Sequence, residues 1–127
     1  MKKILFFILL SVCFFACKKV PGDGGLATIT GKVYAKDFDI NGFLTGEGYI
    51  ADEKVFISYG DNTTVDNDVN TSYNGEYKFE FLQKGKYTVF VYTNCDTCSL
   101  GTRAIMKVVE INSRKEVVVL EDFNIEK

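Results

Sequence analysis

Two cysteines three positions apart, Cys95 and Cys98, form the most distinctive chemical motif of the chain, Cys-Asp-Thr-Cys. Such a pair can close a short disulfide, take part in thiol–disulfide exchange, or contribute to a metal site. A redox role requires the N-terminus of a helix, which lowers the thiol pKa, but strand-forming residues precede the motif here. Structural zinc needs four ligands, which two cysteines without histidine cannot supply. We therefore expect a disulfide that constrains a loop, with redox activity as the alternative.

Acidic and amide side chains crowd the segment 61–70. Asp66, Asp68 and Asn70 match the opening ligand positions of a calcium loop, but Thr71 stands where that loop requires glycine. On a strand the three side chains would share one solvated face, which discourages the addition of a further strand. We expect such a solvated edge and keep the three residues as a calcium candidate.

The sequence shows no recognisable arrangement of catalytic residues. The chain contains no histidine, which excludes Ser–His and Cys–His nucleophile pairs and histidine-ligated metals. Paired carboxylates could hydrolyse a glycoside, but no acidic pair stands in the context of an evident cleft. We predict no catalytic residues, no enzymatic activity, no cofactor and no metal beyond the calcium candidate.

Alternating apolar and polar residues predict an all-β domain over residues 26–127, because no segment keeps a helical period. Asn74-Gly75 predicts a tight hairpin turn with positive φ at both residues. About seven short strands in roughly 100 residues favour a β-sandwich. The expected strands cover residues 27–35, 54–59, 63–72, 76–81, 87–92, 104–111 and 116–123.

Four motifs follow one another along these strands: Gly31-Lys32-Val33, Val55-Phe56-Ile57, Thr71-x-x-x-Gly75-x-Tyr77-x-Phe79 and Leu82-x-x-Gly85-x-Tyr87. In order and spacing they resemble the carboxypeptidase regulatory-like domain, a transthyretin-like, seven-stranded Greek-key sandwich of the immunoglobulin-like type. The resemblance implies a non-enzymatic accessory domain that serves interaction or spacing in secreted and outer-membrane proteins. It brings no catalytic residues.

A long, glycine-rich connection over residues 36–52 carries aromatic side chains, and we expect it to be irregular. Loops on a rigid scaffold commonly carry binding residues, so Phe38, Phe43 and Tyr49, together with Tyr92, are candidates for binding a carbohydrate or peptide. The alternative is that these aromatics pack over one end of the sandwich.

The first 17 residues have a basic start, followed by the apolar residues 4–15, interrupted only by Ser11, then by Ala16 and Cys17. This order resembles a bacterial lipoprotein signal. A helix of that apolar segment would span about 18 Å, too short for a bilayer of about 30 Å. We expect a signal peptide at 1–16, a lipidated Cys17 with a flexible tether at 17–25, and the domain at 26–127. An ordinary secretory signal is the alternative.

The residue after the expected lipidated cysteine suggests where in the cell envelope the protein is located. Lys18 stands where an aspartate would signal retention at the inner membrane, which favours the outer membrane and a periplasmic orientation, with surface display as the alternative. Cleavage removes two of 15 basic residues and none of 17 acidic ones, so the formal net charge of the mature protein is 13 − 17 = −4. An acidic domain gains nothing from nucleic acid electrostatically. We expect a membrane-anchored interaction or structural module whose partner is an envelope protein or a glycan.

Overall fold

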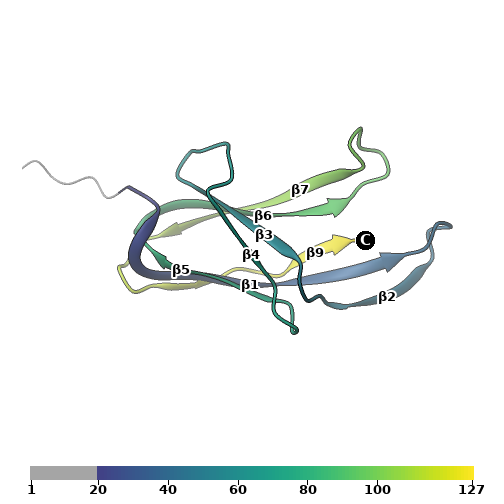
Figure 1. The fold of residues 1–127 in the computed structure, drawn as a ribbon, viewed down its shortest axis with the longest axis horizontal. Coiled ribbons are helices and arrows are strands. Elements are labelled where there is room, and N and C mark those ends of the chain that lie inside the picture. Colours follow the sequence, from purple (N-terminus) through teal and green to yellow (C-terminus); the bar gives the residue numbers. More distant parts are fainter. Residues whose placement is uncertain (1–19) are drawn as a thin grey trace, which may run out of the picture.

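The computed structural model describes residues 20–127, which form nine β-strands in two facing sheets (Figure 1). No helix in this part of the chain is long and apolar enough to span a membrane. The predicted all-β sandwich is confirmed, although the strands number nine and not seven. They are β1 (Asp23–Phe38), β2 (Leu44–Tyr49), β3 (Lys54–Tyr59), β4 (Asn67–Asn70), β5 (Glu76–Leu82), β6 (Gly85–Asn94), β7 (Thr102–Ile111), β8 (Val117–Val119) and β9 (Phe123–Glu126).

The start of the folded domain differs from the sequence expectation. β1 begins at Asp23, before the expected boundary at residue 26. Gly22 is already held against the sandwich, because its N–H donates to the Tyr87 hydroxyl at 2.9 Å and its carbonyl accepts from Gln83 N at 2.8 Å. The predicted signal peptide and Cys17 lie outside the described residues.

β1 is the central strand of the first sheet. On one side it pairs antiparallel with β5 and then with β2, and on the other it runs parallel to β8 and then to β9. Its alternation places Ile29, Gly31 and Val33 in the core, as the sequence pattern predicts, while Thr30 and Lys32 lie on the outer face. One 16-residue strand therefore aligns four others.

The connection 36–52, expected to be irregular, is largely regular structure. β1 continues to Phe38, and β2 pairs back along it from Leu44 to Tyr49. The turn between them is closed because Asp39 Oδ1 accepts the N–H groups of Asn41 and Phe43, at 2.9 and 2.8 Å. The result is a hairpin that projects from one end of the molecule (Figure 1).

The second sheet has the strand order β4-β3-β6-β7. β6 lies between two partners, and its pairing with β7 runs without a break from Gly85↔Ile111 to Asn94↔Thr102. The core between the sheets is formed by side chains from both. Its largest fully buried members are Tyr77, Tyr87, Phe123, Ile29, Ile57, Leu82, Ile111, Ile125, Val33, Val55, Val89 and Val91.

Two sequence expectations about connections are wrong. Only Gly75 of the Asn74-Gly75 pair has positive φ, at 79°, and the turn connects β4 in one sheet to β5 in the other. The bonds Ser72 N to Glu76 O and Gly75 N to Ser72 O make a three-residue loop, which turns the chain into the opposite layer. The last expected strand, 116–123, is divided into β8 and β9, because the strand pairing with β1 is interrupted between residues 119 and 123.

Candidate functional site

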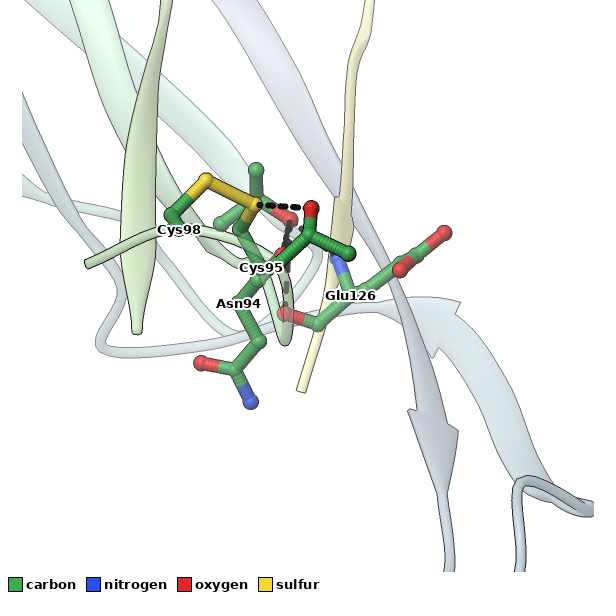
Figure 2. Close-up of a disulfide and its surroundings, with 6 residues drawn as sticks. Asn94, Cys95, Cys98 and Glu126 are labelled. Carbon is green, nitrogen blue, oxygen red and sulfur yellow. Dashed lines mark hydrogen bonds between the residues drawn. A yellow bond between two sulfur atoms is a disulfide. The ribbon is translucent and has the colours of Figure 1, made fainter. Parts of the chain in front are cut away.

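The Cys-Asp-Thr-Cys motif lies in the loop that joins β6 to β7, and its two cysteines form the predicted disulfide (Figure 2). Their Cα atoms are 5.4 Å apart. Backbone bonds from Cys98 N to Cys95 O and from Cys95 N to Gly101 O close the loop further. Because the motif joins two strands, it lacks the helix N-terminus that activates redox cysteines. In the loop-entropy model so short a ring stabilises the fold by about 2 kcal/mol.

The base of this loop is bonded to the C-terminal strand of the other sheet. Thr93, which is buried, accepts a hydrogen bond from Glu126 N at 2.7 Å, and its hydroxyl lies 3.4 Å from Glu126 O (Figure 2). The contact joins β6 to β9 across the sandwich. It holds the backbone at Glu126 beside β6, and the side chains of Asn94 and Glu126 both extend away from the disulfide in Figure 2.

A pocket of about 470 Å³ opens at this end of the molecule, between the β1–β2 turn, the start of the disulfide loop and the C-terminal residues. It is lined by Phe38, Asp39, Ile40, Gly42, Asn94, Asp96, Glu126 and Lys127. A shallower hollow of about 390 Å³ around the disulfide shares three of these residues with it, Asn94, Asp96 and Glu126. The two hollows thus form one polar depression beside an apolar rim.

Some of the polar side chains that line the pocket already bond to other residues of the protein, and others do not. Lys127 pairs with Glu53, and one oxygen of Asp39 is used by the hairpin turn. The side chains of Asn94, Asp96 and Glu126 have no hydrogen-bond partner among residues 20–127. An amide and two carboxylates are therefore free to bond a ligand, beside the apolar surface of Phe38 and the fully exposed Ile40. The arrangement suits a neutral ligand with several hydroxyl groups.

The four aromatic candidates do not form one site. Phe38 lines the pocket, whereas Phe43 does not line it; Phe43 lies in the turn between β1 and β2 and is 70% exposed. Tyr49 lies on the outer face of the first sheet, where its ring meets Tyr34 edge-on at 5.3 Å. The Tyr49 hydroxyl donates to Asp122 at 2.8 Å, and this bond raises the pKa of Tyr49.

Tyr92 belongs to a different surface, the outer face of the second sheet. Phe56 and Phe90 stack there with centroids 5.2 Å apart, and Tyr92 meets Phe56 edge-on at 5.5 Å. Met106, paired with Phe90, extends this surface, and Val108 lies beside it on β7. We call these five residues the outer-face patch. Phe90 and Tyr92 share this face because they are two residues apart on β6.

The calcium candidates are not brought together. Asp66 accepts hydrogen bonds from Tyr59 N and from the Asn62 side chain. Both lower the pKa of the Asp66 carboxyl, and the bond from Tyr59 N lowers it more. Asp68 pairs with Lys54 at 3.2 Å, and Asn70 donates to Asp52 at 2.7 Å. Among residues 20–127 no group of three or more acidic, cysteine or histidine side chains could hold a metal ion.

Sequence reasoning missed most of the pocket. Asp39, Asn94, Asp96 and Glu126 come from three separate segments, and no local spacing links them. One signal was available: Asn41-Gly42, two residues after Asp39, is a hairpin-forming dipeptide in the middle of the supposed irregular connection.

Comparisons with known proteins bear on the fold. No protein-family model matches the chain, and no curated protein matches it. Among solved structures it is similar to a Pseudomonas aeruginosa protein described as a "putative carbohydrate binding protein". The two are 15% identical, the match covers 79% of this chain and 90% of the other, and the TM-score is 0.50. A likeness at this identity defines the class of β-sandwich only.

Proposed function

We propose that this chain is a non-catalytic, lipid-anchored binding module of the bacterial cell envelope, and that its end pocket takes a saccharide. The observation that carries the proposal is the open amide and carboxylates of Asn94, Asp96 and Glu126 beside the apolar face of Phe38. Sugar hydroxyls both donate and accept, and a sugar ring has an apolar face that packs on an aromatic side chain. The pocket volume falls within the range of small-molecule sites, roughly 300–1,000 Å³.

The comparison with the Pseudomonas aeruginosa structure agrees with this choice of ligand, because a protein of the same class is described as carbohydrate-binding. Support for the anchor comes from the sequence, where the apolar segment 4–15 ends at Ala16-Cys17. Several acyl chains on Cys17 would hold the module on a membrane, and Lys18 favours the outer membrane with the domain in the periplasm. An intact-mass measurement and membrane fractionation of Cys17→Ser test the anchor.

Glycan binding by the acylated protein in uncharged detergent tests the ligand. The intact protein is screened on a glycan array, and titration calorimetry is run with the best ligand on Phe38→Ala and Asn94→Ala. Each variant is expected to bind about tenfold more weakly, since each loses a contact of about 1.4 kcal/mol. Phe43→Ala, a neighbouring aromatic outside the pocket, is the matched control and should bind as the wild type does.

Two results would refute the saccharide site: no glycan bound by the folded protein, or equal affinity in Phe38→Ala, Asn94→Ala and Phe43→Ala. Recovery of the bound glycan unchanged after prolonged incubation tests the non-catalytic part of the proposal separately.

The outer-face patch favours a second candidate, docking of an envelope protein on the second sheet. Tyr92 is 47% exposed and Met106 64% exposed, and the stacked Phe56 and Phe90 lie beside them. Aromatic side chains and methionine are enriched in protein interfaces. Capture of one envelope protein by the wild type but not by Tyr92→Ser/Met106→Ser would establish this role, and loss of the same protein from Phe43→Ala would argue against it.

A further inference from the structure

The end of the sandwich opposite the pocket is the end at which the described chain begins (Figure 1). Pro21 and Gly22 lie against this end, with the ring of Pro21 close to Gly85 and Gly22 bonded to Tyr87 and Gln83. β1 leads from this end to the other, and its 16 residues at about 3.3 Å each give a length along the chain of at most about 50 Å. Because Pro21 packs against this end of the sandwich, an anchor that keeps Pro21 near a membrane surface also keeps this end near that surface.

A hollow of about 290 Å³ lies at this end, lined by Gly24, Gly25, Leu82, Gln83, Lys84 and Arg114. Its floor is backbone, because β1 passes so close to β5 that a Cβ atom on Gly25 would lie 1.9 Å from the Leu82 carbonyl oxygen. Gln83 Nε2 donates to Asp23 O at 2.8 Å and fixes one wall. The two longest lining side chains are both cationic.

These cations come from two different turns and have no acidic partner within the described residues. Lys84 lies in the β5–β6 turn and Arg114 in the β7–β8 turn. Two carboxylates beside the hollow are occupied. Glu116, two residues after Arg114, accepts Asn112 N at 2.7 Å and Ser113 N at 3.1 Å, and Asp23, next to Gly24, accepts the Tyr59 hydroxyl at 3.0 Å. Two unpaired cations at one hollow of an acidic protein suit an anion with several oxygens, and Arg and Lys are the usual ligands of phosphate.

We infer that this hollow binds the phosphate of a phospholipid headgroup, with Arg114 and Lys84 bonding its oxygens. The inference rests on the proposed lipid anchor. Cys17 and Pro21 are four Cα–Cα steps apart, at most about 14 Å, so an acylated Cys17 keeps this end at the level of the headgroups. Headgroup binding then stands the domain on its end, and the saccharide pocket faces away from the bilayer.

The test uses the acylated protein in micelles of an uncharged, phosphate-free maltoside detergent. Short-chain phosphatidylglycerol and, separately, inorganic phosphate are titrated in while the amide resonances of Gly24, Gly25 and Lys84 are followed by NMR. Lys84→Gln/Arg114→Gln removes the two cations. Lys36→Gln/Arg103→Gln removes two cations at the other end of the domain and gives the same change of net charge.

We expect saturable shifts with the lipid at a lower concentration than with inorganic phosphate. Binding should weaken at least about tenfold in Lys84→Gln/Arg114→Gln and remain unchanged in the control. Absence of saturation, or equal weakening in both variants, overturns the site. Equal affinity for inorganic phosphate overturns the headgroup assignment in favour of a free anion. The intact mass of the same sample reports acylation, so failure of the anchor is recognised independently of failure of the hollow.

Discussion

Two buried tyrosines show how a single hydroxyl group can either stabilise or weaken this fold. Tyr87 is fully buried, and its hydroxyl accepts from Gly22 N at 2.9 Å and donates to Gln83 O at 2.6 Å. Tyr77 is 1% exposed, and its hydroxyl has no partner within the described residues. It packs directly over Gly31, where a Cβ would lie 2.5 Å from the hydroxyl oxygen. The hydrogen-bonded hydroxyl of Tyr87 therefore stabilises the fold, whereas the unpaired hydroxyl of Tyr77 lowers its stability.

Tyr87→Phe and Tyr77→Phe should therefore change stability in opposite directions. Loss of the Tyr87 hydroxyl leaves Gly22 N buried without a partner and is expected to cost about 1–3 kcal/mol. Loss of the Tyr77 hydroxyl removes an unpaired polar group and should be neutral or stabilise by up to about 1 kcal/mol. Urea unfolding of both variants measures the difference, and an equal loss in the two would contradict this account.

At the scale of elements, two turns of the same kind decide how the chain moves between strands. Asp39 N bonds Phe43 O and Gly42 N bonds Asp39 O, and the same pattern recurs from Ser72 to Glu76. The first turn returns the chain within one sheet, as β2 beside β1. The second carries it into the other sheet, because Val33 N bonds Gly75 O and so places β5 beside β1. The sequence of a turn sets its shape, and its surroundings decide which layer the next strand joins.

The glycines of these turns differ in the space around them, which allows a matched comparison. Gly42 and Gly75 have φ of 81° and 79°. A Cβ on Gly42 meets nothing within 4 Å, whereas one on Gly75 would lie 2.9 Å from both Tyr49 Cβ and Val33 O. Gly42→Ala should cost about 1 kcal/mol from backbone strain alone, and Gly75→Ala clearly more, about 2–4 kcal/mol. Thermal or urea unfolding tests this, and equal costs would show that the contact at Gly75 relaxes freely.

On the scale of the whole molecule, the two sheets are joined by side-chain contacts at both ends. Tyr87 and Gln83 hold the incoming chain at one end, and Thr93 holds β9 at the other. Along one open side, Lys107 of the second sheet donates to the carbonyl oxygens of Glu121 and Asp122, which lie in the segment that joins β8 to β9 of the first sheet. The Lys107 ammonium group is 4.7 Å from the Phe123 ring centre. An inward-pointing lysine also discourages another strand from pairing with β7.

The molecule as a whole should lose stability at alkaline pH. Burial, followed by the hydrogen bond to Asp23, raises the pKa of Tyr59 from 10.0 to about 12, and burial also raises the pKa of Tyr77 and Tyr87. Unfolded tyrosines ionise near pH 10, so the fold favours the neutral form. The stability that the neutral tyrosines contribute is complete below about pH 10, and it is lost as the pH rises through their pKa values in the folded protein.

Urea unfolding at intervals from about pH 8 to about pH 12 tests this, with tyrosinate absorbance as the direct reading of ionisation. The free energy of unfolding is expected to fall only above about pH 10, and less steeply in Tyr59→Phe. A decline that begins near neutral pH would mean that other groups control it.

Much of the architecture followed from local pattern. The spans of β3 and β5, the inward face of β1 and the disulfide were predictable, because strand period, glycine positions and cysteine spacing act over a few residues. β2 could have been predicted from Asn41-Gly42 together with Asp39. The divided pairing of β1, with β8 and β9 on one side and β5 and β2 on the other, has no signature in any one segment.

The sequence by itself determined that this chain forms extended layers with a short cystine loop, since side-chain alternation and loop closure are local properties. Only the tertiary structure decided which end holds a pocket. Phe38, Asn94 and Glu126 are far apart in the chain, and they meet because β1, β6 and β9 end at the same edge of the sandwich. Strand pairing over long sequence separations sets that edge, and it is selected by packing of the whole core and not by any neighbouring residues.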